Sequence, residues 1–339
     1  MKILGIFFGG ISSEYDISII SAEGVLSSVD NKKFKIIEIF IDKKGIFWTG
    51  KNVIEKVKNK NLKELEKVDL NNLAKKIDVA FPVLHGEGGE DGSIQGFLKT
   101  LKIPFVGADI LASAVCLDKY IFNQLMVYNK ISKPKFVGID FLAEDKKEIS
   151  RKIEKIKNKF KFPVFVKPSR AGSSIGVYKV EDKNKLESSI EKATKYDNRI
   201  VIEEAVNCAV EIEVSILGNS VKDFNISILG KIIPGADFYD YDDKYKEENA
   251  VFEIPAKLSN EQIKEIKKIA LYAYKISNCQ GLARVDFLMD KNNKIFLNEI
   301  NTIPGFTPIS MYPKLWIESG LSYKNLITKL VELAIKNYF

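Results

Sequence analysis

Short apolar runs alternate with amphipathic, lysine-rich segments along this chain. Short apolar runs bounded by turn residues predict buried strands, whereas apolar residues three and four positions apart predict helices. The first third of the chain follows this pattern, with strands predicted at residues 2–8, 34–41, 78–84 and 103–106, a helix beginning at residues 13–16 and another at residues 108–127. Residues 51–72 are lysine-rich and are expected to form a mobile connection. The alternation of strands and helices is typical of an α/β fold.

The remaining chain continues the alternation. Its predicted elements are a surface helix at 144–161, two strands around a loop within 162–180, strands at 199–204 and 211–218, and helices at 259–276 and 323–338. Helix 259–276 has the clearest signals, because Ser259 and Gln262 form a capping box at its start. Its apolar stripe consists of Ile263, Ile266, Ala270, Ala273 and Ile276.

A predicted hairpin within residues 281–305 carries the most informative polar pattern. Its two apolar strands set Asp286 against Glu299 and Asn301 across a short polar turn. Residues i and i+2 of a strand share a face, so Glu299 and Asn301 lie together. Two carboxylates and an amide oxygen are hard ligands of the kind that Mg²⁺ prefers. The hairpin therefore predicts a metal-nucleotide site, and an amphipathic hairpin with a polar outer face is the alternative.

A second hairpin, within residues 162–180, contains the loop PSRAGSSIG. Its glycines and serines free a run of backbone N–H groups that can curl round an anion. Lys167 ends the first strand and would reach a phosphate there. The loop is not of the Walker type, because GxxxxGK[ST] is missing and a strand follows it. The alternative is a plain hairpin turn, for which nine residues are long.

Two features near the N-terminus are weak signals when each is taken alone. Gly9 and Gly10 follow the first strand, and Glu14 stands at the start of the next helix. A strand, glycine turn and helix suggest dinucleotide binding, but the six-residue glycine fingerprint is absent. His85, the only histidine, opens a glycine-rich polar loop and has no partner histidines for a metal site.

Composition narrows the class of protein. With 339 residues and 45% hydrophobic residues, the chain can bury the cores of two or three α/β units. No apolar run is long enough for a membrane helix or resembles a signal segment, and three scattered cysteines fit a reducing compartment, so we expect a cytoplasmic protein. The net charge of +7 is spread along helix faces, which disfavours nucleic-acid binding. Only four arginines occur, and two of them, Arg170 and Arg284, lie inside the motifs.

Taken together, these motifs resemble the D-alanine:D-alanine ligase family of the ATP-grasp superfamily. The motifs that carry the resemblance occur in the family's order: GGISSE, HGEGGEDGSIQG, LDK, VKPSRAGSSIG, FYDYDDKY, GLARVDF, LNEINTIPGFT and SMYPKL. The resemblance implies a three-domain ATP-grasp fold in which an N-terminal parallel-sheet domain precedes two α+β domains that clasp ATP. The domains are predicted at residues 1–116 (substrate), 117–210 (central ATP-grasp) and 211–339 (C-terminal, metal and catalytic).

The implied reaction uses ATP to phosphorylate the carboxylate of one D-alanine, and the amine of a second D-alanine then attacks the acyl phosphate. The resemblance implies metal ligands for two Mg²⁺ ions, or Mn²⁺, at Asp286, Glu299 and Asn301. It implies nucleotide contacts at Lys119, Lys167, Ser174, Glu203, Glu204, Val206, Glu211, Lys244 and Asn298. The implied catalytic residues are Glu14, Ser173, Tyr245, Arg284, Gly305 and Ser310, and His85 and Met311 are implied near the substrates. A homodimer is expected by the same resemblance.

Two positions leave the second substrate open. Segment 237–245 is aromatic, acidic and loop-like and could form a mobile lid over a charged ligand. Tyr15, which follows Glu14, and Asp243, within this lid segment, are residues that resemble those of D-alanine:D-serine ligases. Tyr245 and Met311 favour D-alanine, which we rank first, with D-serine second and D-lactate third. Two other hypotheses are a non-catalytic ATP-binding regulator with the same fold and, from the N-terminal glycine turn alone, a dinucleotide-dependent oxidoreductase.

Overall fold

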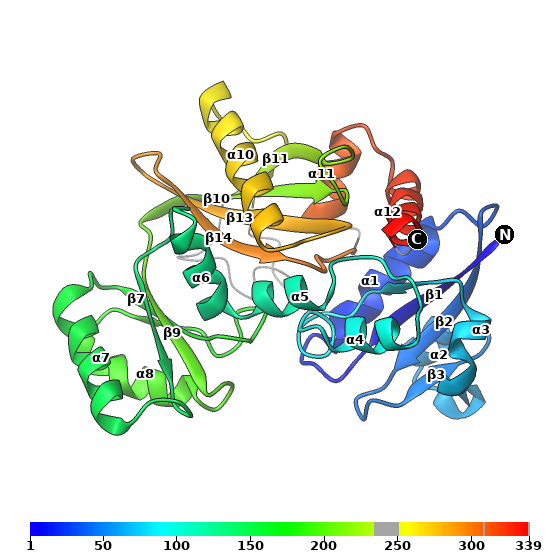
Figure 1. The fold of residues 1–339 in the computed structure, drawn as a ribbon, viewed down its shortest axis with the longest axis horizontal. Helices are drawn as coiled ribbons and strands as arrows, with labels where there is room; N and C mark the ends of the chain where they lie inside the picture. Colours follow the sequence, from blue (N-terminus) through cyan, green and yellow to red (C-terminus); the bar gives the residue numbers. More distant parts are fainter. Residues whose placement is uncertain (234–250, 308, 338–339) are drawn as a thin grey trace.

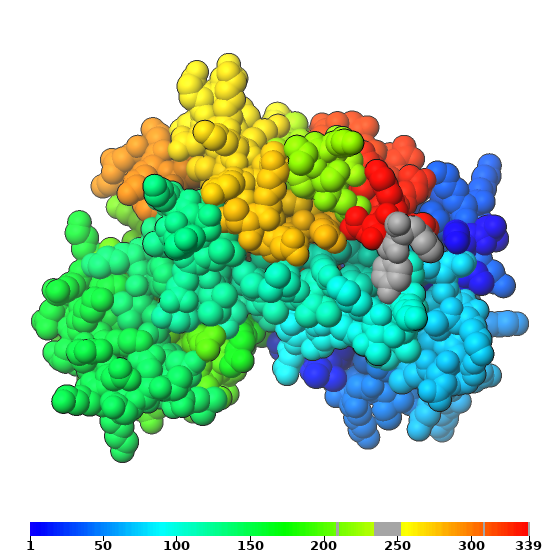
Figure 2. Space-filling model, viewed as in Figure 1, coloured from blue at the N-terminus to red at the C-terminus, as the bar shows by residue number. Residues whose placement is uncertain are grey.

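Three β-sheets organise the computed structural model, which describes residues 1–233, 251–307 and 309–337 (Figure 1). Two sheets have five strands and one has four. The sheets lie in three lobes, and a notch separates the four-stranded lobe from the N-terminal lobe in the space-filling view (Figure 2). This arrangement confirms the α/β class expected from the sequence.

The first sheet has the order β4-β3-β2-β1-β5. Its strands are β1 (Lys2–Gly9), β2 (Phe34–Ile41), β3 (Phe47–Thr49), β4 (Glu66–Lys67) and β5 (Val79–Pro82). Strand β1 pairs in parallel with β2 and β5, and it is buried along most of its length, which explains its continuous apolar run. The predicted strand at 103–106 is reduced to one bridge, between Phe105 and Ala80.

The helices of this lobe are α1 (Tyr15–Ser28), α2 (Val53–Lys58), α3 (Leu73–Lys76) and α4 (Ser93–Thr100), with 3-10 turns at Leu62–Glu64 and Leu70–Asn72. Residues 51–72 were expected to be only a connection, and this was wrong. They contain α2, both turns and β4, because Val53, Val57 and Leu65 are buried in the core of the first sheet.

The predicted helix at 108–127 is two helices, α5 (Ile110–Leu117) and α6 (Lys119–Tyr128), which meet at an angle of 97°. Asp118 causes the break, because its carboxylate accepts hydrogen bonds from the N–H groups of Tyr120 and Ile121 and caps α6. The Sγ atoms of Cys116 and Cys279, far apart in the sequence, lie 3.8 Å apart as free thiols.

The four-stranded sheet has the order β6-β9-β7-β8 and is antiparallel throughout. Its strands are β6 (Phe136–Asp140), β7 (Val164–Pro168), β8 (Tyr178–Val180) and β9 (Arg199–Glu204). Helices α7 (Lys146–Lys159) and α8 (Leu186–Ala193), with a 3-10 turn at Lys183–Lys185, pack on it around a core that includes Ile156 and Leu186. The phosphate-loop hairpin predicted within 162–180 is therefore β7 and β8.

The third sheet has the order β12-β11-β10-β13-β14. Its strands are β10 (Cys208–Leu217), β11 (Asn225–Ile233), β12 (Val251–Glu253), β13 (Leu282–Asp290) and β14 (Ile295–Asn301). Helix α10 (Asn260–Ile276) covers it and begins with the predicted capping box at Ser259 and Gln262. The predicted stripe packs into the sheet core, with Ile266, Ala270 and Ala273 fully buried.

Helices α11 (Met311–Glu318) and α12 (Tyr323–Asn337) end the described chain. Helix α12 packs against α1 and β5, and Leu326, Leu330 and Val331 belong to the same core as β1. The last helix therefore joins the third lobe to the first. Among the described helices, no single one is long and apolar enough to cross a membrane, and only the bent α5–α6 pair passes that test of length and composition jointly.

Candidate active site

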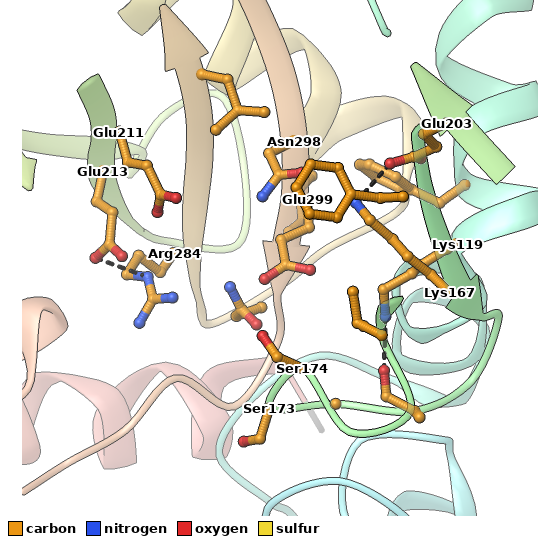
Figure 3. A pocket seen from close by; sticks show the side chains of 18 of the residues that line it. Lys119, Lys167, Ser173, Ser174, Glu203, Glu211, Glu213, Arg284, Asn298 and Glu299 are labelled. Atoms are coloured by element: carbon orange, nitrogen blue, oxygen red, sulfur yellow. Dashed lines mark hydrogen bonds and ion pairs between the residues drawn. The ribbon is translucent and has the colours of Figure 1, made fainter. Parts of the chain in front are cut away.

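One cavity of about 900 Å³ receives side chains from all three lobes (Figure 3). Most of the predicted site residues line it: Glu14, His85, Lys119, Lys167, Ser173, Ser174, Glu203, Glu204, Val206, Glu211, Arg284, Asn298, Glu299, Asn301, Gly305, Ser310 and Met311. Asp286 lies directly behind this lining and is buried. Lys244 and Tyr245, together with the lid segment 237–245, lie outside the described residues.

The β13–β14 hairpin forms one wall of the cavity. Its register pairs Asp286 with Glu299 and Arg284 with Asn301, as the sequence pattern predicted for the carboxylates. The register then shifts, because Phe287 pairs with Leu297 and Asn298 is left as an extra residue. Such a bulge re-aims side chains beside active sites. Strict alternation predicts opposite faces for Asn298 and Glu299, yet both line the cavity.

Arg284 lies at the centre of an ion-pair set on this wall. Its Nε donates to Asp286 Oδ1 at 2.8 Å, its Nη2 donates to Asp286 Oδ2 at 2.7 Å, and its Nε also lies 2.9 Å from Glu213 Oε2. Burial by itself would lower the pKa of Arg284, but Asp286 and Glu213 raise that pKa well above its ordinary value. The guanidinium is therefore a fixed positive charge that no accessible pH removes.

Glu213 is a site residue that the motifs missed. Strand β10 carries it two positions after Glu211, so both carboxylates share the face that lines the cavity. The alternation in the segment EIEV was the available signal. Figure 3 shows Glu211 and Glu213 on one strand, with Glu213 reaching Arg284.

The donor set on this wall suits Mg²⁺ by its chemistry. Across the described ranges, no group of three or more His, Cys, Asp and Glu side chains could hold a metal ion without other donors. Asp286, Glu299 and Asn301 nevertheless combine two carboxylates with an amide, and Mg²⁺ is commonly bound by one or two carboxylates together with substrate phosphates and water. Asp286 also accepts from Asn301 Nδ2 at 2.9 Å, so a metal would compete with Arg284 and Asn301 for its oxygens.

The opposite wall, from the four-stranded lobe, is basic. Lys167 Nζ donates to Glu203 Oε2 at 2.5 Å, and Asn123 Nδ2 donates to Glu203 Oε1 at 2.6 Å. Burial by itself would raise the pKa of Glu203, yet Lys167, with Lys133 behind it, lowers that pKa to about 2. The same carboxylate raises the pKa of Lys167 in spite of burial. Both groups are therefore charged at neutral pH.

Two further lysines carry the basic character toward β14. Lys119 Nζ donates to the carbonyl of Ala171 at 2.6 Å, and burial lowers its pKa. Lys133 was not predicted as a site residue; its Nζ donates to the carbonyl of Asn298 at 2.5 Å, and burial lowers its pKa to about 8. Lys133 thus braces the bulge that turns Asn298 and Glu299 into the cavity.

The loop between β7 and β8, which the sequence predicts to bind phosphate and which is called the phosphate loop below, closes the cavity on the side of the N-terminal lobe. Ser173 and Ser174 both have left-handed backbone conformations, with φ of 47° and 58°. This conformation is unfavourable for serine and persists where surrounding contacts enforce it. The enforcing contact at Ser173 is its hydroxyl, which donates to Glu14 Oε1. Figure 3 shows the Ser174 hydroxyl on the side of Glu299 and the Ser173 hydroxyl farther from Glu299.

Glu14 is buried between two glycine loops. A Cβ at Gly86 would lie 2.5 Å from Glu14 Oε2, and one at Gly172 would lie 2.8 Å from it. Only glycine allows both loops to approach the carboxylate this closely. Nearby, burial raises the pKa of Glu90 to about 8, with Glu14 adding to the effect. Glu90 is a second cavity residue that the motifs did not single out.

The remaining predicted residues occupy two ends of the cavity. At one end, Glu204 is held by Lys135 Nζ at 2.9 Å, beside Val206 and the apolar Phe165 and Leu288. At the other end, a Cβ at Gly305 would lie 2.6 Å from Ser310 Oγ, so this position requires glycine for a close approach.

Besides Asp286, two described residues singled out in the sequence, Arg170 and Tyr15, do not line the cavity. Arg170 pairs with Asp197 through its guanidinium and its backbone N–H, and so anchors the phosphate loop. Tyr15 packs on Phe40 with Lys43 Nζ 4.6 Å from its ring centre. Tyr15 therefore gives no support to the D-serine reading.

Comparisons with known proteins agree with this geometry. Family models described as D-ala D-ala ligase N-terminus and C-terminus match residues 3–108 and 125–332. A D-alanine--D-alanine ligase of Clostridium acetobutylicum is 42% identical, covering 98% of each chain, and one of Acetivibrio thermocellus is 43% identical, covering 98% of this chain and 96% of the relative.

Solved structures agree as well. The VanG D-Ala:D-Ser ligase of Enterococcus faecalis has a TM-score of 0.87 and 34% identity, covering 98% of this chain and 99% of its own. The D-alanine-D-alanine ligase of Coxiella burnetii has a TM-score of 0.83 and 31% identity, covering 99% and 94%. The three sheets and these similarities confirm the predicted three-domain ATP-grasp fold. This chain belongs to the D-Ala-D-Ala ligase family.

Proposed function

We propose that this chain is an ATP-dependent ligase that joins two D-alanines into D-alanyl-D-alanine for peptidoglycan precursor synthesis. One observation carries the proposal: a single cavity sets the Lys119 and Lys167 ammonium groups against Glu299 and the Arg284 ion-pair set, in a chain that matches named ligases over nearly its whole length. That opposition of charges is what transfer of a phosphoryl group to a carboxylate requires.

In the first step, the carboxylate of one D-alanine attacks the γ-phosphorus of ATP and ADP leaves. Lys119 and Lys167 bind phosphate oxygens, and the loop at Ser173 and Ser174 covers them with backbone N–H groups. Asp286, Glu299 and Asn301 would hold two Mg²⁺ ions, or Mn²⁺, which neutralise charge on the phosphates when bound. Lys244, outside the described residues, is proposed as a further phosphate contact.

In the second step, the amine of another D-alanine attacks the acyl phosphate, and phosphate leaves the tetrahedral intermediate. Arg284 and the Gly305 N–H stabilise the oxyanion of that intermediate, and such donors are commonly worth about 3 kcal/mol each. Glu14, held by Ser173, binds the ammonium of the first D-alanine, and Tyr245 is proposed to complete this chain. Ser310 and Met311 form the pocket for the second D-alanine.

The nucleotide base occupies the apolar end of the cavity in this proposal. Glu203 and the backbone groups of Glu204 and Val206 face the adenine, and Glu211 binds the ribose hydroxyls, with Asn298 close by. The Lys167–Glu203 pair orients the Glu203 carboxylate before the nucleotide arrives. We also propose a cytoplasmic homodimer, with small molecules as its substrates and neither nucleic acid nor membrane as a partner.

Phosphate release tests the reaction. The purified protein should release phosphate from ATP only when both D-alanine and Mg²⁺ are present, and mass spectrometry should detect the dipeptide. ATP turnover that ignores D-amino acids would contradict the proposal. Tight ATP binding without any product, across varied acceptors, would instead support a non-catalytic nucleotide-binding protein.

The second substrate needs its own assay. D-alanine, D-serine and D-lactate should compete as acceptors in one reaction across a range of pH, because an amine acceptor must lose a proton before it attacks. We expect D-alanine to dominate. A D-alanyl-D-serine product in excess would assign the enzyme to the other acceptor class.

A further inference from the structure

Both ring nitrogens of His85 are engaged by the protein itself. Nδ1 lies 3.1 Å from the carbonyl oxygen of Ile303, and Nε2 lies 3.0 Å from Ser21 Oγ. A carbonyl oxygen only accepts, so Nδ1 carries the hydrogen. Burial lowers the pKa of His85, which keeps the ring neutral. Nε2 is then an acceptor, and the Ser21 hydroxyl donates to it.

Ser21 holds a second group of the same loop. The N–H of Phe306 donates to Ser21 Oγ at 3.3 Å, and Ser21 is fully buried on α1. The Ser21–His85 pair therefore holds residues 303–306 at both ends: His85 bonds to the carbonyl of Ile303, and Ser21 bonds to the N–H of Phe306. Gly305, whose N–H faces the reaction in the proposed function, lies between these two points.

Other contacts of the N-terminal lobe and α12 act on the same loop. The Tyr323 hydroxyl donates to the carbonyl of Phe306 at 2.6 Å, and a Cβ at Gly24 would lie 2.4 Å from that oxygen. The N–H groups of Gly86 and Ile303 both favour the ionised form of Glu90. The loop after β14 is thus positioned by the nearby Tyr323 and by His85 and Ser21, which are more than 200 residues away in the sequence.

We propose that Ser21 is a positioning residue that fixes residues 303–306, directly at the Phe306 N–H and through His85 at the Ile303 carbonyl, and so aims the Gly305 N–H at the oxyanion. The proposal rests on the ligase function proposed above. In this proposal His85 is a strut, meaning a side chain that links the first lobe to residues 303–306. Protein groups already make hydrogen bonds to both of its ring nitrogens. Ser21 itself contacts neither substrate nor nucleotide in this role.

Ser18 provides a matched control on the same helix. It is also fully buried, it accepts from the Gly9 N–H at 2.9 Å and it donates to the carbonyl of Val83 at 2.5 Å. Removing either hydroxyl leaves buried partners without a hydrogen bond, so both variants should lose comparable stability. The bonds of Ser18 do not reach residues 303–306, whereas those of Ser21 do.

Steady-state kinetics separate the two serines. Ser21→Ala should lower kcat by about tenfold, since a small displacement of an oxyanion donor slows the chemical step, with KM for ATP unchanged. Ser18→Ala should leave kcat within about twofold of the wild type. Equal losses of kcat in the two variants would overturn the proposal. In a His85→Gln background, Ser21→Ala should lower kcat by clearly less than in the wild type, because the link through His85 is already lost and only the hydrogen bond from the Phe306 N–H remains to be removed. Losses of kcat that multiply fully would overturn the coupling of the two residues.

The single histidine gives a readout that does not depend on activity. The protein without an affinity tag contains one imidazole ring, so its ¹⁵N NMR spectrum reports on His85 alone. At neutral pH this spectrum should show a protonated Nδ1 and an unprotonated Nε2. Ser21→Ala should shift the Nε2 resonance and the amide of Phe306, and Ser18→Ala should move neither. The opposite tautomer, or a charged ring, would overturn the assignment.

If Ser21→Ala does not fold, Ser21→Cys keeps the shape with a weaker donor and should produce the same shifts and a smaller loss of kcat. An inactive wild type with the expected NMR signature would refute the ligase proposal and leave the strut standing.

Discussion

The β13–β14 wall of the cavity and the phosphate loop that closes it are built in different ways. The β13–β14 wall is a paired ladder in which Asp286 lies opposite Glu299 and Arg284 lies opposite Asn301. The phosphate loop between β7 and β8 has no ladder to hold it. Arg170 ties it to Asp197, Ser173 ties it to Glu14, and Lys119 binds the carbonyl of Ala171.

The hairpin and the phosphate loop therefore owe their rigidity to different interactions. Backbone pairing fixes the hairpin side chains before any ligand binds, and the buried ion pairs of Arg284 reinforce that geometry. The loop depends on a few long-range side-chain contacts and keeps two serines in left-handed conformations. Changes on the hairpin should therefore act on the chemical step, and changes on the loop should act on ligand capture.

The largest expected effect is on the hairpin wall. Arg284→Lys keeps the positive charge but loses the planar fork that meets Asp286 and Glu213 together. We expect kcat to fall by about a hundredfold or more, with ADP binding nearly unchanged. Single-turnover kinetics and calorimetric titration with ADP measure the two quantities. Arg199→Lys, at an ion pair with Asp118 and Asp140, serves as the control. A fall in ADP affinity as large as the fall in kcat would contradict the claim that changes on the hairpin act on the chemical step and not on nucleotide binding.

Glu14→Gln tests the point where the loop meets the N-terminal lobe. The amide cannot offer a full charge to an ammonium group, so KM for the first D-alanine should rise by about tenfold while the affinity for ATP stays the same. Ser173→Ala should show the same trend more weakly, since it removes only the hydrogen bond to Glu14. Initial rates over a grid of D-alanine and ATP concentrations give both constants. Matched losses for both substrates would argue against the assigned role.

Asp197→Asn loosens the loop from a distance. Arg170 would lose its charged partner, so the loop should close less often over the phosphates. We expect KM for ATP to rise by about threefold with little change in kcat, because Asp197 is buried but the Arg170 side chain is half-exposed, and an ion pair with a solvent-exposed partner contributes modestly. Stopped-flow binding of a fluorescent ATP analogue checks the association rate. An effect on kcat alone would show that the loop, like the hairpin, acts on the chemical step, and would contradict the comparison.

The smallest effect concerns stability against pH. The folded pKa of Glu203 is about 2, below its ordinary 4.5. Its ionised form therefore stabilises the fold above about pH 4.5, and this contribution is lost as pH falls from about 4.5 toward 2. Glu203→Gln should lower the free energy of unfolding at pH 7 and show a shallower decline in that acid range. Chemical denaturation across pH measures both curves, and parallel curves would contradict the shifted pKa.

Sequence patterns predicted the parts of the fold that depend on local periodicity. The capping box of α10 and the Asp286–Glu299 pairing are confirmed. Two predictions failed for different reasons. Asp118, inside the helix predicted at 108–127, breaks that helix by capping α6, which apolar periodicity alone does not register. Burial of Val53 and Val57 against the first sheet, which depends on distant residues, turns an expected connection into ordered elements.

The sequence by itself determined the family and the residue types of the site, because motif order and alternation are written along the chain. Only the tertiary structure decided which groups meet. It turned Asn298 and Glu299 together through a bulge, gave Arg284 a second partner in Glu213, and closed Ser21 and His85 around residues 303–306. The physical reason is that hydrogen bonds and ion pairs act over a few ångströms in space, whatever the separation along the chain.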